Sequence, residues 1–355
     1  MKGASLFPLS VCIIAKNEEK HIEECLRRLS PYGFEIVLTD TGSTDRTLAI
    51  AEKYADRIYH FDWCNDFSAA RNFCMQKASY DRILSLDCDE YIEKLDAAAL
   101  GRSMDQYPDR TGRILVRSRF LRSGQATFEQ TRISRLADRR YFHFTGTVHE
   151  QLERLDGSTK AIYDAPVTIL HVGYDETEAD MQEKSRRNVA LLTAQLDREG
   201  PDPYLYFQLG QCYRRLGDAE NAFHSFDAGL SMEADPSLDY VKTMVESYGY
   251  TLLDLKRAQE ALGLAGLYDV FAGRADFVFL MGLIYMNNGL FDAAVAEFKK
   301  SVTIEEFAVD GVNSYMAYYN IGVIYECTGR IGEAREYYKK CEEYAPAGER
   351  LKALG

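Results

Sequence analysis

Two carboxylates separated by one residue carry the clearest chemical signal in this sequence. Asp87 and Asp89 come directly after the apolar residues 83–86. An apolar run of this length predicts a buried strand, whose end would place both acids at the edge of a sheet. Their oxygens would suit a hard cation, which can in turn bind a diphosphate. Aspartates at a strand end are also ordinary turn and helix-cap residues, so the pair alone leaves both interpretations open.

The first half of the chain alternates predicted strands with predicted helices. The strands are expected at residues 9–15, 34–38, 58–61 and 83–86, and the helices at residues 17–29, 47–54 and 67–78. This alternation indicates a parallel sheet with helices on both faces, which binds its ligands at the carboxyl ends of the strands. Further along, residues 113–121 and 131–136 predict a hairpin.

Polar residues follow three of the four predicted strands. Ala15, Asn17 and Glu18 end the first strand, Asp40 ends the second, and Asp87 follows the fourth. We expect these residues to share one edge of the sheet. The glycine-rich motifs of dinucleotide-binding and P-loop folds are absent from these positions. Carboxylates in their place indicate that acceptor groups bind the base and ribose of a nucleotide, and that a divalent ion binds its diphosphate.

Four segments, in this order, resemble those of the family 2 glycosyltransferases with the GT-A fold. They are residues 10–18, 40–45, 66–72 and 87–90, and the likeness extends over roughly residues 8–175. The chain is most similar to bacterial members that carry tetratricopeptide repeats, which include peptide glycosyltransferases and are related to enzymes of envelope synthesis. The resemblance implies an inverting enzyme that uses Mg²⁺ or Mn²⁺ and a nucleoside-diphosphate sugar, here expected to be a UDP-sugar.

The resemblance also implies roles for the residues at the strand ends. Ala15, Asn17 and Glu18 would contact the base and ribose, and Asp40 would accept a hydrogen bond from the nucleobase. Such polar groups need partners in a pocket that excludes water. The alternatives are local. Asp40 can serve as a turn acceptor for residues 42–45, and Asn17 and Glu18 can start a helix.

The expected metal site lies after the fourth strand. Asp87 would face the ribose or the metal, and Asp89 is the main expected ligand because a cation there neutralises charge on the departing diphosphate. Cys88, between them, is expected to be a compact filler. Arg71 either binds phosphate through its fork of donors or is an exposed helix cation.

Two histidine-containing segments complete the expected site. An inverting transfer needs a group that takes the proton of the acceptor. Glu150 is the expected base, with His149 as its orienting partner or as the alternative base. The family more often uses an Asp of a Glu-Asp pair, which this chain lacks. His171, in residues 170–174, is expected to be a third metal ligand or a diphosphate donor, and the alternative is a core histidine.

Composition limits the partners. A formal net charge of −13 argues against nucleic acid or an anionic membrane surface as the main partner. The 8 cysteines are scattered without a Cys-x-x-Cys pair, which favours reduced thiols and a cytoplasmic location. The longest apolar run, residues 277–286, is about half of a membrane span, so none is expected. A run of arginines from Arg102 to Arg140 indicates recognition of an anion, although most of its members are expected on solvated strand faces.

The second half of the chain repeats a pattern of glycine, then tyrosine, then alanine and an aromatic residue, which is typical of tetratricopeptide repeats. The glycines are Gly210, Gly249, Gly282 and Gly322, and the alanines are Ala222, Ala261, Ala294 and Ala334. The unit around Gly249 is degenerate, and the glycine spacings of 39, 33 and 40 predict insertions in the first and third units. Phe226, Phe298 and Tyr338 are expected to fill the gaps between helices.

The sequence therefore predicts an α/β GT-A-like domain in residues 1–180 and an all-α tetratricopeptide-repeat solenoid in residues 181–355. The expected function is metal-dependent transfer of a sugar to a peptide or protein held by the repeats. One alternative is an enzyme that builds an envelope saccharide on a lipid-linked acceptor. Another is a scaffold with an inactive transferase domain. The repeats can also serve only to stabilise the enzyme or to form a homodimer.

Overall fold

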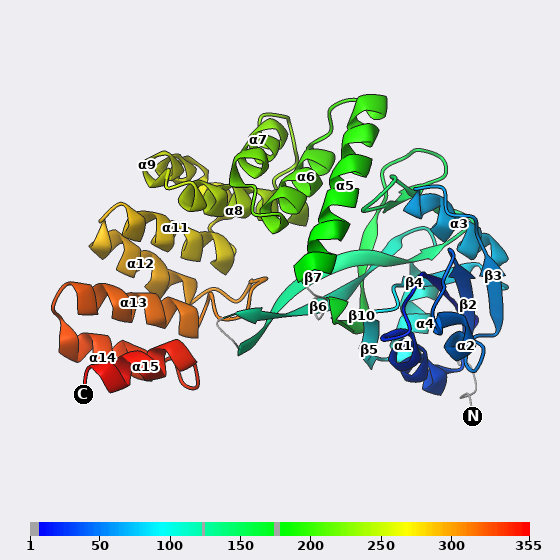
Figure 1. Ribbon diagram of the computed structural model, residues 1–355, viewed down its shortest axis with the longest axis horizontal. Coiled ribbons are helices and arrows are strands. Elements are labelled where there is room, and N and C mark those ends of the chain that lie inside the picture. The colour runs from blue at the N-terminus through cyan, green and yellow to red at the C-terminus, as the bar shows by residue number, and fades with distance from the viewer. Residues whose placement is uncertain (1–6, 123–124, 174–177) are drawn as a thin grey trace. The chain divides into compact units, whose positions relative to one another are not determined.

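The computed structural model describes residues 7–122, 125–173 and 178–355. The chain divides into two compact units. The first contains Met1–Phe120 and Gln130–Thr177, and the second contains Leu121–Glu129 and Glu178–Gly355. The predicted order, an α/β domain followed by a helical repeat array, is confirmed (Figure 1).

The first unit is built on a mixed eight-stranded sheet of order β3-β2-β1-β4-β7-β6-β10-β5. Its strands are β1 (Ser10–Ala15), β2 (Glu35–Asp40), β3 (Arg57–His60), β4 (Arg82–Leu86), β5 (Glu90–Leu95), β6 (Thr111–Arg122), β7 (Gln125–Asp138) and β10 (Ile162–His171). The predicted parallel arrangement is confirmed for β3, β2, β1 and β4. Beyond β4 the sheet is mixed, because β7 and β5 run antiparallel to their neighbours β4 and β10.

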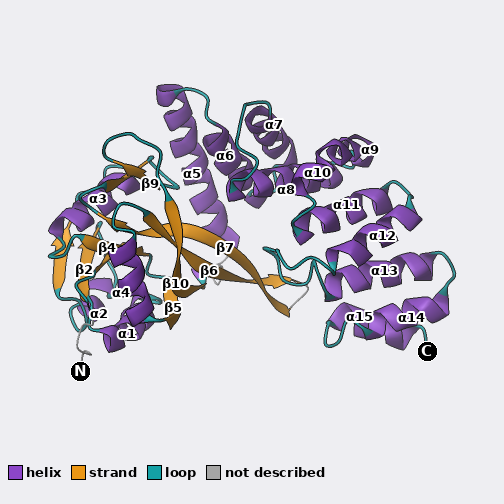
Figure 2. Ribbon diagram, turned by 180° about the vertical axis from the view of Figure 1, so that it is seen from behind, coloured by secondary structure: helices purple, strands orange, loops and turns teal. Residues whose placement is uncertain are grey.

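Helices cover both faces of the parallel strands (Figure 2). They are α1 (Ile22–Leu29), α2 (Thr47–Ala51), α3 (Phe67–Lys77) and α4 (Ala97–Gln106). Side chains of β1 alternate between the faces. Val11 and Ile13 join the core that contains α1 and α4, whereas Cys12 joins the core that contains Cys74 of α3. The second core also holds a separate ribbon of β8 (Phe142–Thr145) and β9 (Gln151–Arg154).

The first helix begins five residues later than predicted. Asn17 has φ 57°, in the left-handed region that an α-helix cannot contain, and α1 starts at Ile22. The alternative in which Asn17 and Glu18 start a helix is therefore wrong. Residues 16–21 instead form a loop at the end of β1.

The second unit consists mainly of helices that pack as neighbouring pairs (Figure 1). They are α5 (Glu178–Glu199), α6 (Pro203–Arg215), α7 (Ala219–Leu230), α8 (Asp239–Asp254), α9 (Ala258–Ala261), η3 (Leu262–Leu267), α10 (Tyr268–Phe271), α11 (Ala275–Asn287), α12 (Phe291–Ser301), α13 (Tyr315–Cys327), α14 (Ile331–Lys339) and α15 (Ala345–Ala353). The degenerate repeat is α8 followed by the short helices α9, η3 and α10, which replace one regular second helix.

Glycines let the paired helices approach closely, as predicted. A Cβ atom on Gly210 would lie 2.3 Å from the ring of Phe226, and one on Gly282 would lie 2.6 Å from the ring of Phe298. Gly322 has the same relation to Tyr338. These rings are fully buried, so they fill the gap that each glycine leaves.

The insertion of the third repeat, residues 302–314, contacts the tip of the β6–β7 hairpin inside the second unit. The amide of Asp310 donates to the carbonyl of Phe128 at 2.9 Å, and Glu129 and Val309 form an antiparallel bridge. On its other side, the insertion is held by Asp276, whose carboxylate accepts from the amides of Ala308 and Val309. The extra residues of this repeat therefore add a short pairing surface.

All 8 cysteines lie in the described residues and are free thiols, and six of them are buried. Among the described helices, none has the length and apolar character that crossing a bilayer requires.

Candidate active site

The carboxyl ends of β1, β2 and β4 meet at one edge of the sheet. Ala15 pairs with Asp40 across β1 and β2, and Ile13 pairs with Leu86 across β1 and β4. The thiol of Cys88 donates to the carbonyl of Ile14 at 3.6 Å. The structure thus brings the predicted residues after these three strands to a common edge.

The first two loops at this edge are joined by hydrogen bonds. The amide of Asn17 donates to Ser43 Oγ at 3.0 Å, and Asn17 Oδ1 accepts from the amide of Thr44 at 2.8 Å. The amide of Glu18 donates to Thr47 Oγ1 at 2.7 Å. The left-handed backbone at Asn17 turns the loop so that these bonds form, and Asn17 and Glu18 are therefore fixed against the loop that follows Asp40.

Asp40 is buried and acts as a turn acceptor. Its carboxylate accepts from the amides of Gly42 and Ser43 at 3.1 Å each. The ring of His60, at the end of β3, lies 3.3 Å from Asp40 Oδ2 and is 74% exposed. The local alternative for Asp40 is thus present in the structure, and the ring of His60 also contacts the carboxylate.

Asp87 lies between two arginines. Arg71 Nη2 contacts Asp87 Oδ1 at 2.6 Å, and Arg135 Nη2 contacts Asp87 Oδ2 at 2.8 Å. Burial opposes ionisation of this carboxyl, but the attraction of both guanidinium groups outweighs it and holds the pKa of Asp87 well below its usual range. Asp87 is therefore a carboxylate with both oxygens paired.

Arg71 is buried, so the alternative of an exposed helix cation is wrong. Besides Asp87, its guanidinium contacts Glu150 Oε1 through Nε and donates to Ser85 Oγ through Nη1 at 3.0 Å. Its donors are thus shared among three protein groups. This single side chain links the end of β4 to Glu150, 79 residues away in the chain.

Local structure explains why Arg71 is so well placed. Asp66 caps α3 by accepting from the amide of Ala69 at 2.9 Å. One turn later, Asn72 donates to the carbonyl of Phe144 and accepts from its amide, both at 2.8 Å. The segment 66–72 therefore fixes the start of α3 and attaches it to the strand that leads to Glu150.

Arg135 and Glu90 belong to the site but were not predicted as members. Arg135 Nη2 contacts Glu90 Oε1 at 2.8 Å, and Glu90 Oε2 accepts from the amide of Asp87 at 2.9 Å. Burial raises the pKa of Glu90 above its usual value. Arg135 is one of the arginines of this run that face inward, and its side chain is 12% exposed. The alternation of polar and apolar residues in the predicted strand 131–136 was the only signal in the sequence that some of these arginines would face inward.

Asp89 and His171 form a pair. His171 Nε2 lies 3.2 Å from Asp89 Oδ2, and Ser118 Oγ lies 3.2 Å from His171 Nδ1. Burial lowers the pKa of His171, but the hydrogen bond and charge of Asp89 outweigh this and raise it overall. A Cβ atom on Gly173 would lie 2.3 Å from Asp89 Oδ2, so the glycine makes room for the pair. Tyr174, the end of this motif, lies outside the described residues.

Glu150 and His149 follow a turn with unusual backbone. Gly146 has φ 93° and His149 has φ 54°, and the side chain of Glu150 is 8% exposed. A positive φ at a histidine is uncommon and stores strain, which is frequent at functional sites. The turn directs the Glu150 carboxylate toward Arg71, whereas His149 has an intermediate exposure.

The donor set can be compared with the requirements of a divalent cation. In the described part of the chain, no group of three or more His, Cys, Asp or Glu side chains is close enough to hold a metal ion by itself. Asp87 is paired with arginines, but Asp89 and His171 are adjacent and offer one oxygen and one imidazole ligand. Two such protein ligands fit Mn²⁺ or Mg²⁺ when substrate oxygens and water complete the shell.

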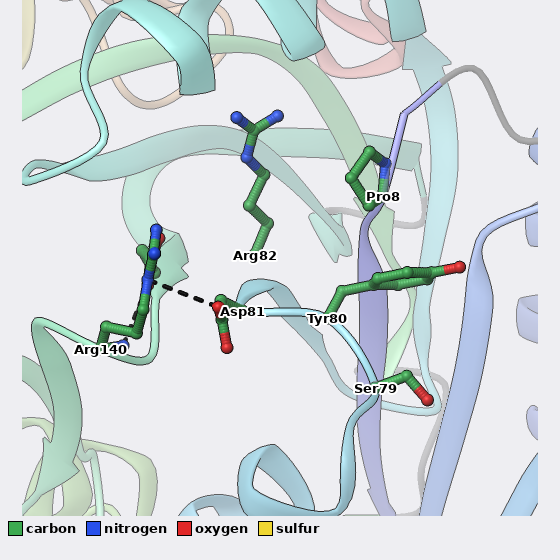
Figure 3. A pocket seen from close by; sticks show the side chains of 7 residues that line it. Pro8, Ser79, Tyr80, Asp81, Arg82 and Arg140 are labelled. Carbon is green, nitrogen blue, oxygen red and sulfur yellow. Dashed lines mark hydrogen bonds and ion pairs between the residues drawn. The ribbon is translucent and has the colours of Figure 1, made fainter.

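A pocket of about 240 Å³ lies at the other edge of the sheet, near the amino ends of β1 and β4 (Figure 3). Figure 3 shows Arg140 paired with Asp81, and the other arginine of the pocket, Arg82, contacts Asp105. None of the predicted site residues lines it. This pocket is therefore separate from the candidate active site.

Comparison with known proteins gives a family match for each half of the chain. The family Glycosyl transferase family 2 matches residues 10–152, and the tetratricopeptide repeat matches residues 203–236, 275–307 and 316–347. A TPR repeat-containing protein of Synechococcus elongatus is 26% identical over 357 residues, which cover 97% of this chain and 77% of that protein.

Two named glycosyltransferases are also similar. The SPbeta prophage-derived glycosyltransferase SunS of Bacillus subtilis is 27% identical over 253 residues, or 68% of this chain and 54% of SunS. The lipopolysaccharide core biosynthesis glycosyltransferase LpsC of Rhizobium meliloti is 33% identical over 92 residues, or 24% of this chain and 33% of LpsC. The chain thus joins a segment that matches the family 2 glycosyltransferases to three segments that match tetratricopeptide repeats.

Proposed function

We propose that this chain transfers a sugar from a nucleoside-diphosphate sugar to an acceptor, with inversion at the anomeric carbon. The observation that carries the proposal is the position of Asp87 and Asp89. They follow β4 at the edge where β1 and β2 also end, inside the segment matched by the glycosyltransferase family. Ligands of α/β sheets bind at this edge.

The first two loops would bind the nucleotide, expected to be UDP. Ala15, Asn17 and Glu18 would face the base and ribose, and their bonds to the second loop support a preformed site. Asp40 would accept a hydrogen bond from the base on the side where it now contacts His60. Because the imidazole of His60 is largely exposed, it can turn into solvent when the base binds.

Asp89 and His171 would hold a divalent cation, Mg²⁺ or Mn²⁺. Bound there, the cation would neutralise the charge of the departing diphosphate. Ser118 would orient the ring of His171 through Nδ1, a common arrangement around a metal-binding histidine. Asp87 would act beside the ribose, where its paired oxygens stay ionised.

Glu150 would be the base. The acceptor attacks the anomeric carbon as the bond to the diphosphate breaks, and its proton moves to the carboxylate. Arg71 contacts Oε1, so we assign the proton to Oε2. His149 remains the alternative base, because it precedes Glu150 directly in the chain and is partly exposed.

The acceptor would be a peptide or protein, because tetratricopeptide repeats offer an extended concave surface for such ligands. A second candidate acceptor is an envelope saccharide on a lipid carrier. The similarity to LpsC, which extends over 92 residues, favours this candidate. The repeats support the first candidate because they make up three matched segments of this chain.

The donor can be identified by thermal shift with a panel of nucleoside-diphosphate sugars, each with and without Mn²⁺. We expect one of them to raise the melting temperature with Mn²⁺, because a ligand that binds only the folded state stabilises it. Hydrolysis of that donor should be lost in Asp89→Ala. The control is Asp105→Asn, which lies beside the distant pocket and should leave hydrolysis unchanged. No stabilisation by any donor would instead support a scaffold with an inactive transferase domain.

A further inference from the structure

Five charged side chains of alternating sign form a continuous series through the candidate site. In spatial order they are Glu150, Arg71, Asp87, Arg135 and Glu90. The series begins at the proposed base, Glu150, and ends at Glu90, which directly follows Asp89 in the chain. Its four contacts link residues from α3, β7, the start of β5, the loop after β4 and the turn before β9.

Four of the five side chains of this series are largely shielded from water. Arg71 is 6% exposed, Glu150 is 8% exposed, Arg135 is 12% exposed and Glu90 is 4% exposed, whereas Asp87 is 34% exposed. A buried ion pair stabilises a fold weakly at best, because its desolvation offsets the attraction. What such a pair does supply is a defined geometry for each partner. Three carboxylates held by two guanidinium groups are therefore better explained by orientation than by stability.

Arg71 is the second member of the series and joins Glu150 to Asp87. Its Nε contacts Glu150 and its Nη2 contacts Asp87, so one rigid planar group fixes the distance between the two carboxylates. Nη1 donates to Ser85, and the ring of Phe144 lies 5.6 Å from the guanidinium carbon. These contacts leave the guanidinium little freedom, which argues against the expected role of Arg71 as a phosphate ligand.

Arg135 contacts carboxylates on one side of the site only. Its Nη2 contacts both Asp87 and Glu90, and Glu90 in turn accepts from the amide of Asp87. Its Nε is buried without a hydrogen-bond partner among the described residues. An unsatisfied buried donor is unfavourable, which again indicates a residue retained for the site rather than for stability.

We propose that Arg71 is a positioning residue that couples the acceptor side of the site to the donor side, whereas Arg135 positions the donor side alone. Arg71 holds Glu150 in place for proton transfer and Asp87 in place for the nucleotide. Arg135 holds only Asp87 and the turn behind it. This inference rests on the proposed function, because it assigns the two sides by the roles of Glu150 and Asp87.

The test is a set of variants assayed for hydrolysis of the identified sugar nucleotide. For each variant, the donor KM and the kcat of hydrolysis are measured. Glu150→Gln should lower kcat about 100-fold and leave the donor KM unchanged, because only proton transfer is lost. Arg135→Lys should raise the donor KM about tenfold and change kcat less than about threefold. Arg71→Lys should change both, because a single ammonium cannot span the two carboxylates.

A double variant tests the coupling directly. If Arg71 acts on kcat through Glu150, Arg71→Lys with Glu150→Gln should have about the kcat of Glu150→Gln alone, while its donor KM stays raised. The matched control is Arg139→Lys. Arg139 donates to the carbonyls of Met75 and Ala78 at the other end of α3, so its loss should lower the melting temperature without changing KM or kcat.

The outcomes separate this inference from the function on which it rests. If the wild-type chain turns over no sugar nucleotide, the proposed function fails and this inference fails with it. If the wild type is active but the effects of Arg71→Lys and Glu150→Gln on kcat multiply, the coupling is wrong. It is also wrong if Arg71→Lys lowers only the melting temperature, as Arg139→Lys does. Ser85→Ala removes the hydrogen bond between Arg71 Nη1 and Ser85 Oγ with little risk to folding. It should shift the donor KM and kcat in the same directions as Arg71→Lys does.

Discussion

The two units hold their buried groups in different ways. In the first, guanidinium groups and carboxylates hold one another, as Arg71 holds Asp87 and Glu150. In the second, a missing side chain makes room for a ring, as Gly282 does for Phe298. The first arrangement depends on charge and direction, and the second on volume.

This difference indicates what each unit is built for. Close packing of apolar groups stabilises a fold with little requirement on the direction of any one contact. Buried ion pairs add little stability but fix orientation. We therefore expect changes in the repeats to act mainly on unfolding, and changes in the charged series to act mainly on catalysis.

The largest expected effect comes from removing a ring between paired helices. Phe298→Ala should lower the free energy of unfolding by about 3–5 kcal/mol, because it leaves a cavity opposite Gly282. Denaturant unfolding measures the change. The control is Phe291→Ala in the same helix, whose side chain is already 38% exposed and should cost far less. Equal losses in both variants would contradict the role of volume in this unit.

A buried carboxyl group in the repeats, Glu246, tests how a charge acts in the second unit. Burial raises the pKa of Glu246 to about 8, despite the attraction of Arg274 and Lys242, while Asp276 and Glu129 add to the rise. Between the unfolded pKa of about 4.3 and this value, the folded chain binds more protons than the unfolded chain. Its stability should therefore fall as pH rises through this range, by up to about 1.4 kcal/mol per unit.

Glu246→Gln should remove this contribution. Urea unfolding at pH 5.5, 6.5 and 7.5 should give a flatter pH dependence for the variant than for the wild type, by at most about 2.5 kcal/mol over these two pH units. Parallel curves for the two proteins would show that Glu246 does not carry the effect. A flatter curve for the variant would mean that ionisation of Glu246 lowers the stability of the second unit. This agrees with the expectation that changes in the repeats act mainly on unfolding.

A change of volume in the first unit should act on catalysis. In Gly173→Ala, the new Cβ would lie 2.3 Å from Asp89 Oδ2 and 2.8 Å from His171 Nε2, so the pair must separate. We expect a loss of about tenfold in donor hydrolysis, or about 1.4 kcal/mol in activation free energy. The melting temperature should change little. Gly348→Ala, where no atom lies within 4 Å of the new Cβ, controls for the substitution itself.

The smallest effect is expected for an exposed ion pair. Arg330 and Glu333 contact each other on the surface of the second unit, and both side chains are 46% exposed. Glu333→Gln should leave the free energy of unfolding nearly unchanged, because water and salt screen such pairs. A clear loss of stability in the same unfolding assay would mean that charge also stabilises the repeats.

Sequence periodicity predicted the parts of the structure that depend on local order. The strand ends at Ala15, Asp40 and Asp87 share an edge because parallel strands do so whatever their partners are. The glycines of the repeats lie opposite Phe226, Phe298 and Tyr338 because each spacing is internal to one repeat. In both cases the distance along the chain determines the neighbour.

The charged series could not be predicted in this way. Arg135 reaches Asp87 because Leu136 of β7 pairs with Leu84 of β4, a register between segments about 50 residues apart. Arg71 reaches Glu150 through contacts of α3 with the strand that precedes Glu150. Asn17 adopts its left-handed backbone because bonds to the next loop offset the local strain. Each depends on tertiary neighbours that one sequence does not reveal.

The pairing of Phe128 and Glu129 with Val309 and Asp310 has a consequence for biosynthesis. The ribosome completes the hairpin roughly 180 residues before the segment that pairs with it, which is a delay of roughly 10–35 s at about 5–20 residues per second. During that time the hairpin tip exposes unpaired backbone groups that can recruit other nascent strands. The tip therefore becomes protected only after residue 310 has been synthesised, so a stop codon before that point leaves it open.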